Sequence, residues 1–407
     1  MSLIPVDEAL ARVLASIERP VAAESRPIAA CAGRTLAEDL AALRDQPPFP
    51  ASAMDGYAVR HADAAAIPAT LRLIGTSAAG HGFPGAVGPG EAVRIFTGAP
   101  VPAGADAIVI QEDSEAADGR VTVREAPKPG RFVRPAGLDF RRGDALLHAG
   151  ARLDARRLAL AAAMGHGTLA VRRRPRVAIV ATGDELVRPG EPAGPDQIVA
   201  SNPYAIAAIV EKAGGEALDL GIALDTFEAL EERIGAARHA EADILVTLGG
   251  ASVGDHDLVQ SALHRQGMSL GFWRVALRPG KPLMHGRLGP MLLLGLPGNP
   301  VSSIVCGILF LVPAIRALLG DPQAGEDISE PALLGAPLPV NDARQDYLRA
   351  GLVRRPESWP VATAHARQDS SMLAILERSD ALIVRAPHAP AAEAGESCRI
   401  IALDRFC

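Results

Sequence analysis

VAIVATGDEL, residues 177–186, decides the fold of the central part of this 407-residue chain. Its first five residues are all apolar, which is typical of a strand buried on both faces of a sheet. The same pattern, an apolar run that ends in a glycine-containing turn, returns in ILVTLGG at residues 244–250 and in MLLLGLPGNP at residues 291–300. Such strands with helical segments between them predict a doubly wound parallel sheet.

The helical segments follow from apolar spacing and from their end signals. One begins at Ser201 or Asn202 and ends at Gly214, where a left-handed residue is expected. Others are predicted at residues 226–240, 255–266 and 300–319, the last with a candidate kink at Pro313. Together they make residues 175–325 the doubly wound domain. The basic run just before it, residues 172–176, is interpreted as a solvated linker.

Outward from this domain the patterns change. Residues 5–17 and 154–164 are helical, and we expect them to pack side by side in a split helical domain of residues 1–43 and 144–174. Between these pieces, residues 44–143 are rich in Gly and Pro and carry short β-type runs, which predict a β-rich second domain. Short β-type runs return after residue 326 and predict a small C-terminal β domain of residues 326–407.

The composition excludes several classes of protein. The net charge is −6 and only 3% of the residues are aromatic, so neither a nucleic-acid groove nor a base-stacking platform is expected. The four cysteines form no close pair, which favours a reducing compartment over a disulfide framework or a zinc site. The apolar run at residues 304–312 stops at Pro313, too short for a membrane span, and acids stand where a signal peptide has bases. A cytoplasmic location is the expectation.

Three unusual loops follow the predicted strands, at residues 182–185, 249–257 and 297–300. Each alone reads as an ordinary turn or a helix start, but the carboxyl ends of parallel strands meet at one edge of a sheet, where ligands bind. Amides of Gly249 and Gly250, and the helix start at Asn299 and Pro300, could hold phosphate oxygens.

Acidic residues stand in the same loops. Asp184, Glu185 and Asp257 would repel phosphate unless a hard cation such as Mg²⁺ lies between them. Asp225 follows an apolar run at residues 218–224, and it could either join these carboxylates or cap the helix that follows.

A cationic loop carries Arg274, Arg278 and Lys281, the last followed by Pro282. It is either an exposed basic turn or a site where two cations meet on one small anion. Lysine is rare in this chain, since only Lys128, Lys212 and Lys281 occur, and this favours a chemical role for Lys281.

Six motifs in order carry a resemblance: SAMDGYA at 52–58, TGAP at 97–100, TGDEL at 182–186, SVG at 252–254, RPGKP at 278–282 and GLPGNP at 295–300. Together they resemble the molybdopterin molybdenumtransferases, the family that includes the gephyrin E domain, over essentially the whole chain.

The resemblance implies four domains and an elongated homodimer. It implies insertion of molybdate into adenylylated molybdopterin with release of AMP, the last step of molybdenum cofactor synthesis, with Mg²⁺ as the divalent cation. The cleft would lie between the doubly wound domain of one subunit and the second domain of the other. Implied partners are the molybdopterin adenylyltransferase and molybdoenzyme chaperones, with no nucleic acid and no membrane.

Site residues carry over by position. The acidic site residues around cation and pyrophosphate are Glu185, Asp225 and Asp257, with Asp55 reaching in from the partner. The substrate-binding residues implied are Thr97, Arg134, Asp139, Asp184, Gly249, Gly250, Ser252, Arg274, Arg278, Lys281, Pro282, Pro297, Asn299, Pro300, Ser302, Arg349 and Ser370.

Three positions depart from the family pattern, and two other functions compete. Arg274 and Arg278 replace lysines with a planar fork, and Asp369 stands where relatives have Gly. A single-domain molybdopterin adenylyltransferase would resemble only residues 175–320. A scaffold that holds the pterin without turnover is the other alternative, and the acidic residues argue against it.

Overall fold

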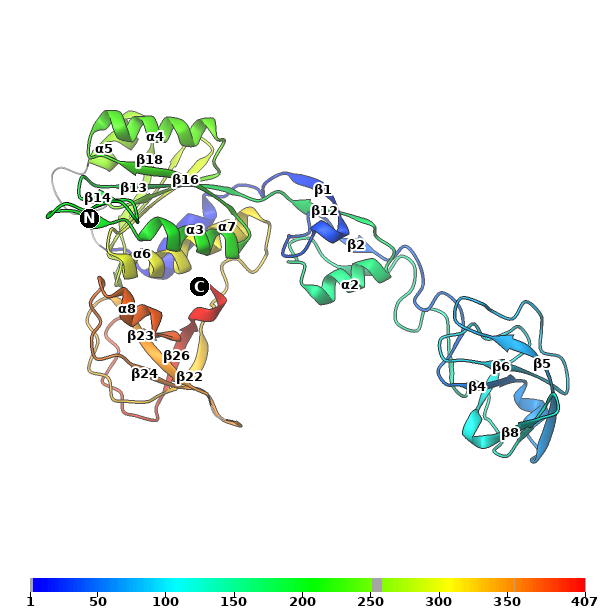
Figure 1. Ribbon diagram of the computed structural model, residues 1–407. Helices are drawn as coiled ribbons and strands as arrows, with labels where there is room; N and C mark the ends of the chain where they lie inside the picture. Colours follow the sequence, from blue (N-terminus) through cyan, green and yellow to red (C-terminus); the bar gives the residue numbers. More distant parts are fainter. Residues whose placement is uncertain (1–2, 251–257, 355, 407) are drawn as a thin grey trace.

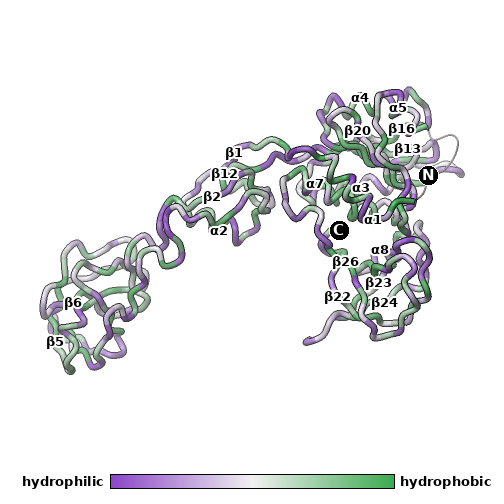
Figure 2. Tube along the Cα trace, turned by 180° about the vertical axis from the view of Figure 1, so that it is seen from behind, coloured by the Kyte–Doolittle hydropathy of each residue, from purple (hydrophilic) through white to green (hydrophobic). Residues whose placement is uncertain are grey.

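The computed structural model describes residues 3–250, 258–354 and 356–406. The molecule is elongated (Figure 1), with a sheet lobe and a C-terminal lobe at one end, an arm lobe in the middle and a distal lobe at the other end. Seen from behind (Figure 2), thin chain crossings join the arm lobe to its neighbours. The boundaries of the four predicted domains stay a prediction.

The sheet lobe is built on a six-stranded sheet. Its order is β16 (Glu216–Ala223), β13 (Arg176–Thr182), β17 (Ile244–Leu248), β21 (Met291–Leu296), β20 (Pro282–Leu288) and β18 (Ser269–Arg274). The first four strands are parallel, as predicted. At the other edge β20 pairs antiparallel with both β21 and β18, a feature that the strand pattern did not predict. The turn at Gly289 and Pro290 is too short for a crossover and can only close a hairpin.

Helices cover both faces of this sheet. One face carries α1 (Val6–Ala15), α3 (Asn202–Ala213), α6 (Pro300–Cys306) and α7 (Val312–Leu318), and the other carries α4 (Phe227–His239) and α5 (Leu258–Arg265). Alternate residues of β13 serve the two faces: Val177 and Ile179 pack on the first, Ala178 and Val180 on the second. The doubly wound arrangement is thus confirmed.

The long apolar helix runs through α6, a π-helical turn at Gly307–Leu311 and α7. Pro313 lies in the first turn of α7, and the wider π turn precedes the residue that cannot donate a backbone hydrogen bond. Residues Pro300–Leu318 are long and apolar enough to cross a membrane, contrary to our estimate from the shorter run. However, 83% of the window is buried inside the protein, which identifies it as a core helix.

The arm lobe differs from the predicted split helical domain. Its two chain pieces join through strands, β1 (Ala23–Pro27) with β12 (Thr168–Arg172) and β2 (Leu40–Ala41) with β11 (Ala145–Leu147). Helix α2 (Ala155–Ala163) packs in this lobe's own core. The expected pairing of the first helix with α2 was wrong, because α1 buries Val6, Ala9 and Val13 in the core of the sheet lobe.

The basic run before β13 is also more ordered than a solvated linker. Arg173 forms two hydrogen bonds to the Asp243 carboxylate, both 2.7 Å. Arg174 pairs with Glu211 at 3.0 Å. The Arg173 contacts hold the start of β13 against the sheet lobe, so the linker interpretation was wrong at Arg173, whereas Arg174 is exposed as expected.

The two remaining lobes are β structures, as predicted. The distal lobe has the sheet order β7 (Ala107–Ile110), β4 (Gly56–Val59), β6 (Glu91–Ile95), β5 (Ala69–Ser77), β9 (Arg120–Val123) and β8 (Ser114–Ala117), with β3 (Ala51–Ser52) paired to β10 (Val133–Arg134). The C-terminal lobe has the order β19 (Leu277–Arg278), β23 (Gln345–Val353), β24 (Val361–Ala364), β22 (Glu330–Leu334), β26 (Ser397–Ala402) and β25 (Ala381–Arg385), and β23 also pairs with β25. That extra pairing closes the sheet into a small barrel.

Candidate functional site

A cavity of about 810 Å³ lies at the carboxyl ends of the parallel strands. The loops after β13, β17 and β21 all line it, as the strand pattern predicts. Of the predicted site residues, those in its wall are Glu185, Asp225, Gly249, Gly250, Pro282, Pro297, Asn299 and Pro300. Ser252 and Asp257 lie outside the described residues.

The acidic loops after β13 and β16 are tied together. The Asp184 carboxylate accepts a hydrogen bond from the backbone N–H of Asp225 at 3.0 Å. Partial burial, followed by the negative charges of Asp184 and Glu185, raises the pKa of Asp225. The structure therefore places Asp225 with the other carboxylates and supports the first of its two readings, since Thr226 caps α4.

Whether the cavity could hold a metal ion depends on its carboxylates, Glu185 and Asp225. Among the described residues, no three His, Cys, Asp or Glu side chains come together as a ready cation site. Mg²⁺ is commonly held by one or two carboxylates together with substrate phosphates and water. Glu185 and Asp225 both line the cavity, and a cation between them would relieve the negative charge that, after burial, raises the pKa of Asp225, so these two carboxylates fit such an ion.

The glycine turn after β17 lets the backbone approach its neighbours. Gly249 and Gly250 have φ of 102° and 65°, in the left-handed region. A Cβ on Gly249 would stand 2.8 Å from the Thr182 carbonyl oxygen, and one on Gly250 would stand 2.2 Å from Val259 Cγ2. A side chain at either position would therefore crowd its neighbours. The Gly249 N–H already donates to the Leu296 carbonyl at 3.2 Å, so the predicted binding of phosphate by this amide is not supported, and Gly250 is left as the candidate at the cavity wall.

The helix start after β21 is braced by residues that the sequence reading missed. Asn202 Nδ2 donates a 2.6 Å hydrogen bond to the Gly298 carbonyl, and Ser303 Oγ donates to the Pro297 carbonyl. Ser201, Asn202 and Pro203 line the cavity too. The sequence marked Asn202 only as a helix start, and its partner lies 96 residues away.

One helix-start amide is already occupied. The N–H of Val301 donates to the Ser370 carbonyl at 3.0 Å, so a phosphate has fewer free donors there than predicted. The same contact brings the C-terminal lobe to the cavity, which Ser371 and Leu373 also line. Ser302 is buried in α6.

The cationic loop does not converge as expected. Arg278 pairs with Asp342 at 3.0 Å and with the buried carboxylate of Asp346. It does not line the cavity. Arg274 lies over the Trp273 ring at 5.4 Å. The predicted meeting of Arg278 and Lys281 on one anion is therefore not seen, because acids of the C-terminal lobe hold Arg278.

Lys281 remains as the available cation. It is exposed, directly precedes the cavity residue Pro282, and forms no ion pair within the described part of the chain. Gly280, just before it, has a φ of 118°, and a Cβ there would stand 2.5 Å from Cys306 Sγ. The turn that presents Lys281 thus packs tightly on α6.

Arg349 is a buried cation, only 1% exposed. Its guanidinium donates to Gln368 Oε1, to the Met372 carbonyl at 3.0 Å and to the Arg367 carbonyl at 3.3 Å. Burial lowers its pKa. Arg349 thus holds the loop of Ser370 and does not point its donors at open space, which differs from the pocket role that the resemblance implied.

Asp369, the departure in this loop, is satisfied locally. Its carboxylate accepts hydrogen bonds from Ser371 Oγ at 2.6 Å and from the Ser371 N–H at 2.9 Å. These bonds, and the charge of Arg349, lower the pKa of Asp369. The added negative charge therefore shapes the turn at the cavity.

The predicted residues of the second domain gather in the distal lobe. Asp55 Oδ1 accepts from the Thr97 N–H at 2.7 Å and from Thr97 Oγ1 at 2.8 Å, and these bonds lower the pKa of Asp55. Arg134 is near them through the β3–β10 pair, while Asp139 is exposed and bonds Gln46 through its backbone. Figure 1 places this lobe at the end of the molecule opposite the sheet lobe, whose strand ends line the cavity, so one chain does not bring the two sets together.

Comparisons with known proteins cover the whole length. The chain matches the MoeA N-terminal region (domain I and II) over residues 4–165, a probable molybdopterin binding domain over 178–317, and the MoeA C-terminal region (domain IV) over 331–403. It is 34% identical to a molybdopterin molybdenumtransferase of Haemophilus influenzae, covering 98% of both chains. It is 38% identical to one of a Nostoc species, covering 86% of this chain and 82% of that one.

The fold agrees with a solved structure. A molybdopterin biosynthesis MoeA protein from Pyrococcus horikoshii superposes with a TM-score of 0.86 at 26% identity, covering 98% of this chain and 100% of the other. Sequence and fold comparisons therefore agree over nearly the whole chain. The chain belongs to the molybdopterin molybdenumtransferase family.

Proposed function

We propose that this protein inserts molybdate into adenylylated molybdopterin and releases AMP, as the last step of molybdenum cofactor biosynthesis. The relatives named molybdopterin molybdenumtransferase support the transfer of molybdenum to molybdopterin. The observation that carries the finer proposal is the cavity at the sheet edge, where Gly250, two carboxylates and the turn of Lys281 come together.

The residues divide the work by their chemistry. The Gly250 amide would bind a phosphate of the substrate, and Asn299 and Asn202 would shape the wall beside it. Glu185 and Asp225 would hold Mg²⁺ against these phosphates. A bound Mg²⁺ would offset the charge that develops on the phosphate of the leaving AMP.

Lys281 is assigned to the molybdate. An ammonium group is a compact point charge that can turn its three donors toward an oxyanion. Because Arg278 is held by Asp342 and Asp346, Lys281 would carry the electrostatic attraction at this turn. Arg349 would act indirectly, because its hydrogen bonds hold the loop that places Ser370 and Ser371 at the cavity.

The site would be completed by a second copy of the chain. The Asp55–Thr97 pair and Arg134 lie at the far end of the elongated molecule, and an isologous homodimer could bring one subunit's distal lobe to the other's cavity. We also propose the cytoplasm as its location, and as partners the adenylyltransferase that supplies the substrate and chaperones that receive the product.

The test is AMP release from adenylylated molybdopterin. The proposal expects release that depends on both molybdate and a divalent cation, with molybdenum recovered on the pterin. Binding of the substrate without turnover would instead identify a scaffold. Consumption of ATP to make adenylylated molybdopterin would identify an adenylyltransferase, and either result would overturn the proposal.

A further inference from the structure

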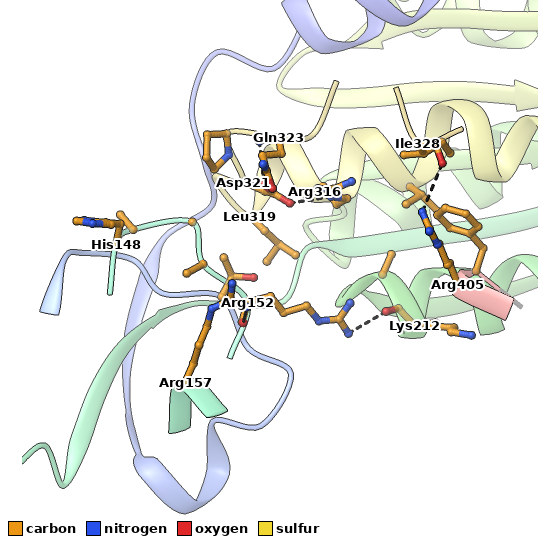
Figure 3. Close-up of a pocket in the computed structure, with 18 of the residues that line it drawn as sticks. His148, Arg152, Arg157, Lys212, Arg316, Leu319, Asp321, Gln323, Ile328 and Arg405 are labelled. Carbon is orange, nitrogen blue, oxygen red and sulfur yellow. Dashed lines mark hydrogen bonds and ion pairs between the residues drawn. The ribbon is translucent and has the colours of Figure 1, made fainter. Parts of the chain in front are cut away.

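A second cavity of about 520 Å³ lies where the arm lobe, the sheet lobe and the end of the chain meet (Figure 3). It shares no lining residue with the cavity at the sheet edge. Its size falls in the range of small-molecule sites, roughly 300–1,000 Å³. None of the roles proposed above uses it.

The wall of this cavity is strongly basic. It contains Arg152 and Arg157 from the arm lobe, Lys212 and Arg316 from the sheet lobe, and Arg405 from the end of the chain. Asp321 is its acidic side chain within the described residues. This concentration of cations occurs in a chain whose net charge is −6, so it does not follow from the overall composition.

The guanidinium groups keep hydrogen-bonding capacity. Arg316 uses Nε to bond Asp321 at 2.7 Å, and its two terminal nitrogens form no hydrogen bond in the part of the chain that the structure covers. The Arg316 side chain is 28% exposed, so these nitrogens lie in partly desolvated surroundings. Arg152 bonds the Lys212 carbonyl at 2.9 Å and pairs with no carboxylate among the described residues.

The arginines come from different walls. Figure 3 shows Arg152, Arg316 and Arg405 extending around the same space from separate segments of the chain. Arg405 pairs with Glu330 at 2.5 Å, which fixes its position beside the cavity and partly offsets its charge, so Arg152 and Arg316 carry most of the attraction. Planar guanidinium forks match the oxygens of phosphate groups, and cations in a concave wall focus their field into it.

We propose that this cavity binds a small phosphate-bearing anion. A ligand there would contact the arm lobe, the sheet lobe and the end of the chain at once, and so it would hold the three together. The inference does not depend on the proposed function, since it rests on side chains outside the sheet-edge cavity. The shared chemistry, a multiply charged phosphate, could come from a free inorganic anion or from a nucleotide.

The test is calorimetric titration of the intact protein with pyrophosphate, and separately with AMP, at constant ionic strength. We expect a binding event that Arg316→Gln weakens by about tenfold or more, the loss of one charge-assisted contact. Asp321→Asn should tighten the same event severalfold, because it removes a negative charge and keeps an acceptor for the Gln323 N–H, now 2.9 Å from the Asp321 carboxylate. A purely structural role of these residues would not produce that opposite change.

A control variant separates this cavity from exposed arginines elsewhere on the molecule. Arg120→Gln removes an exposed arginine of the distal lobe and should leave the event unchanged. Circular dichroism of each variant checks folding. Stronger binding of pyrophosphate than AMP would identify an inorganic ligand, and the reverse would identify a nucleotide. Equal affinity of the wild type, Arg316→Gln and Asp321→Asn for both anions would overturn the proposal.

Discussion

Lys281 and Arg278 stand three residues apart, yet their surroundings separate their roles. Arg278 is paired with Asp342 and Asp346, which suits a planar fork that bonds two acids. Lys281 has no such partner in the described chain, and the residue after it lines the cavity. At the residue scale, the oxyanion is therefore expected to depend on the lysine.

The first prediction is that Lys281→Ala raises the molybdate concentration needed for AMP release. Loss of one charge-assisted contact should cost about 1.5–3 kcal/mol of binding free energy, roughly a tenfold to hundredfold increase in the requirement. Thermal unfolding should be unchanged because the side chain is exposed. Arg274→Ala, at the end of β18, is the matched control, because this side chain lies over the Trp273 ring and outside the cavity wall. An unaltered molybdate dependence in Lys281→Ala would remove this residue from the anion site.

The second prediction concerns the carboxylates at the sheet edge. Glu185→Gln keeps the shape of the side chain and removes its charge, so it should bind adenylylated molybdopterin but hydrolyse it slowly. The measurement is single-turnover AMP release as Mg²⁺ is varied. Asp219→Asn is a control, since Asp219 is an acid of β16 outside the cavity wall. If wild-type hydrolysis persists after exhaustive chelation of divalent cations, the role of Glu185 in holding Mg²⁺ is wrong.

At the scale of elements, the antiparallel edge of the sheet carries a buried histidine. His285 on β20 is 4% exposed, stacks on Phe272 with 5.0 Å between ring centroids, and lies 3.2 Å from Ser16 Oγ through Nε2. Burial, then the charges of Arg12 and Arg287, lowers its pKa to about 4. The folded protein therefore keeps His285 neutral.

The third prediction follows from that lowered pKa. The unfolded chain binds the proton more tightly, near an ordinary pKa of about 6.5, so protonation favours unfolding. The neutral His285 therefore contributes roughly 3 kcal/mol to the free energy of unfolding. This contribution is fully present above pH 6.5, the approximate pKa in the unfolded chain, and is lost as the pH falls toward 4. Urea unfolding at a series of pH values measures it. His285→Gln should flatten this part of the profile, and the exposed His81→Gln should not. Parallel profiles for wild type and His285→Gln would contradict the assignment.

The glycine pair that follows β17 is the second element that we can test. Gly250 has a φ of 65° and would meet Val259 Cγ2 at 2.2 Å if it gained a Cβ. The fourth prediction is that Gly250→Ala lowers the free energy of unfolding by about 1–3 kcal/mol, from backbone strain and crowding. It should also weaken AMP binding, because the loop must move. Gly235→Ala in α4 is the control, since a Cβ there meets nothing within 4 Å. Equal AMP affinity in both variants would show that the turn does not face the nucleotide.

For the whole molecule, the separation of the distal lobe from the cavity is the feature with functional consequences. The Asp55–Thr97 pair is held by two hydrogen bonds in a lobe joined to the rest by two chain crossings. Lobes with so few connections move relative to one another unless another surface docks against them. A partner subunit would supply that surface.

The fifth prediction uses mixed dimers. A heterodimer of Asp55→Ala and Glu185→Gln subunits would place both defects in one composite cavity and leave the other intact. It should regain up to about half of the wild-type AMP release per dimer, while each parent homodimer stays inactive. A heterodimer with both changes on one subunit is the matched control, because each of its cavities carries one defect. Mixed dimers as inactive as the parents would make Asp55 a structural residue of its own lobe.

Local sequence signals were sufficient for much of this structure. The apolar runs that became β13, β17 and β21, the start of α3 at Asn202 and its end at Gly214 all depend on neighbours in the chain. The glycine turns also depend on local sequence, because a backbone position with a positive φ favours glycine. The meeting of three loops at one edge followed from these strands being parallel. Six ordered motifs, taken together, were specific enough to indicate the family.

Only the tertiary structure decided the contacts between segments that are distant in sequence. The packing of α1 on the sheet lobe, the antiparallel pair β18–β20, the capture of Arg278 by Asp346 and the hydrogen bond from Asn202 to Gly298 are of this kind. An apolar stripe or a charged side chain specifies that it needs a partner but not which one. Periodicity could therefore place each element, whereas the choice among chemically equivalent partners depended on which surfaces the folded chain brings into contact.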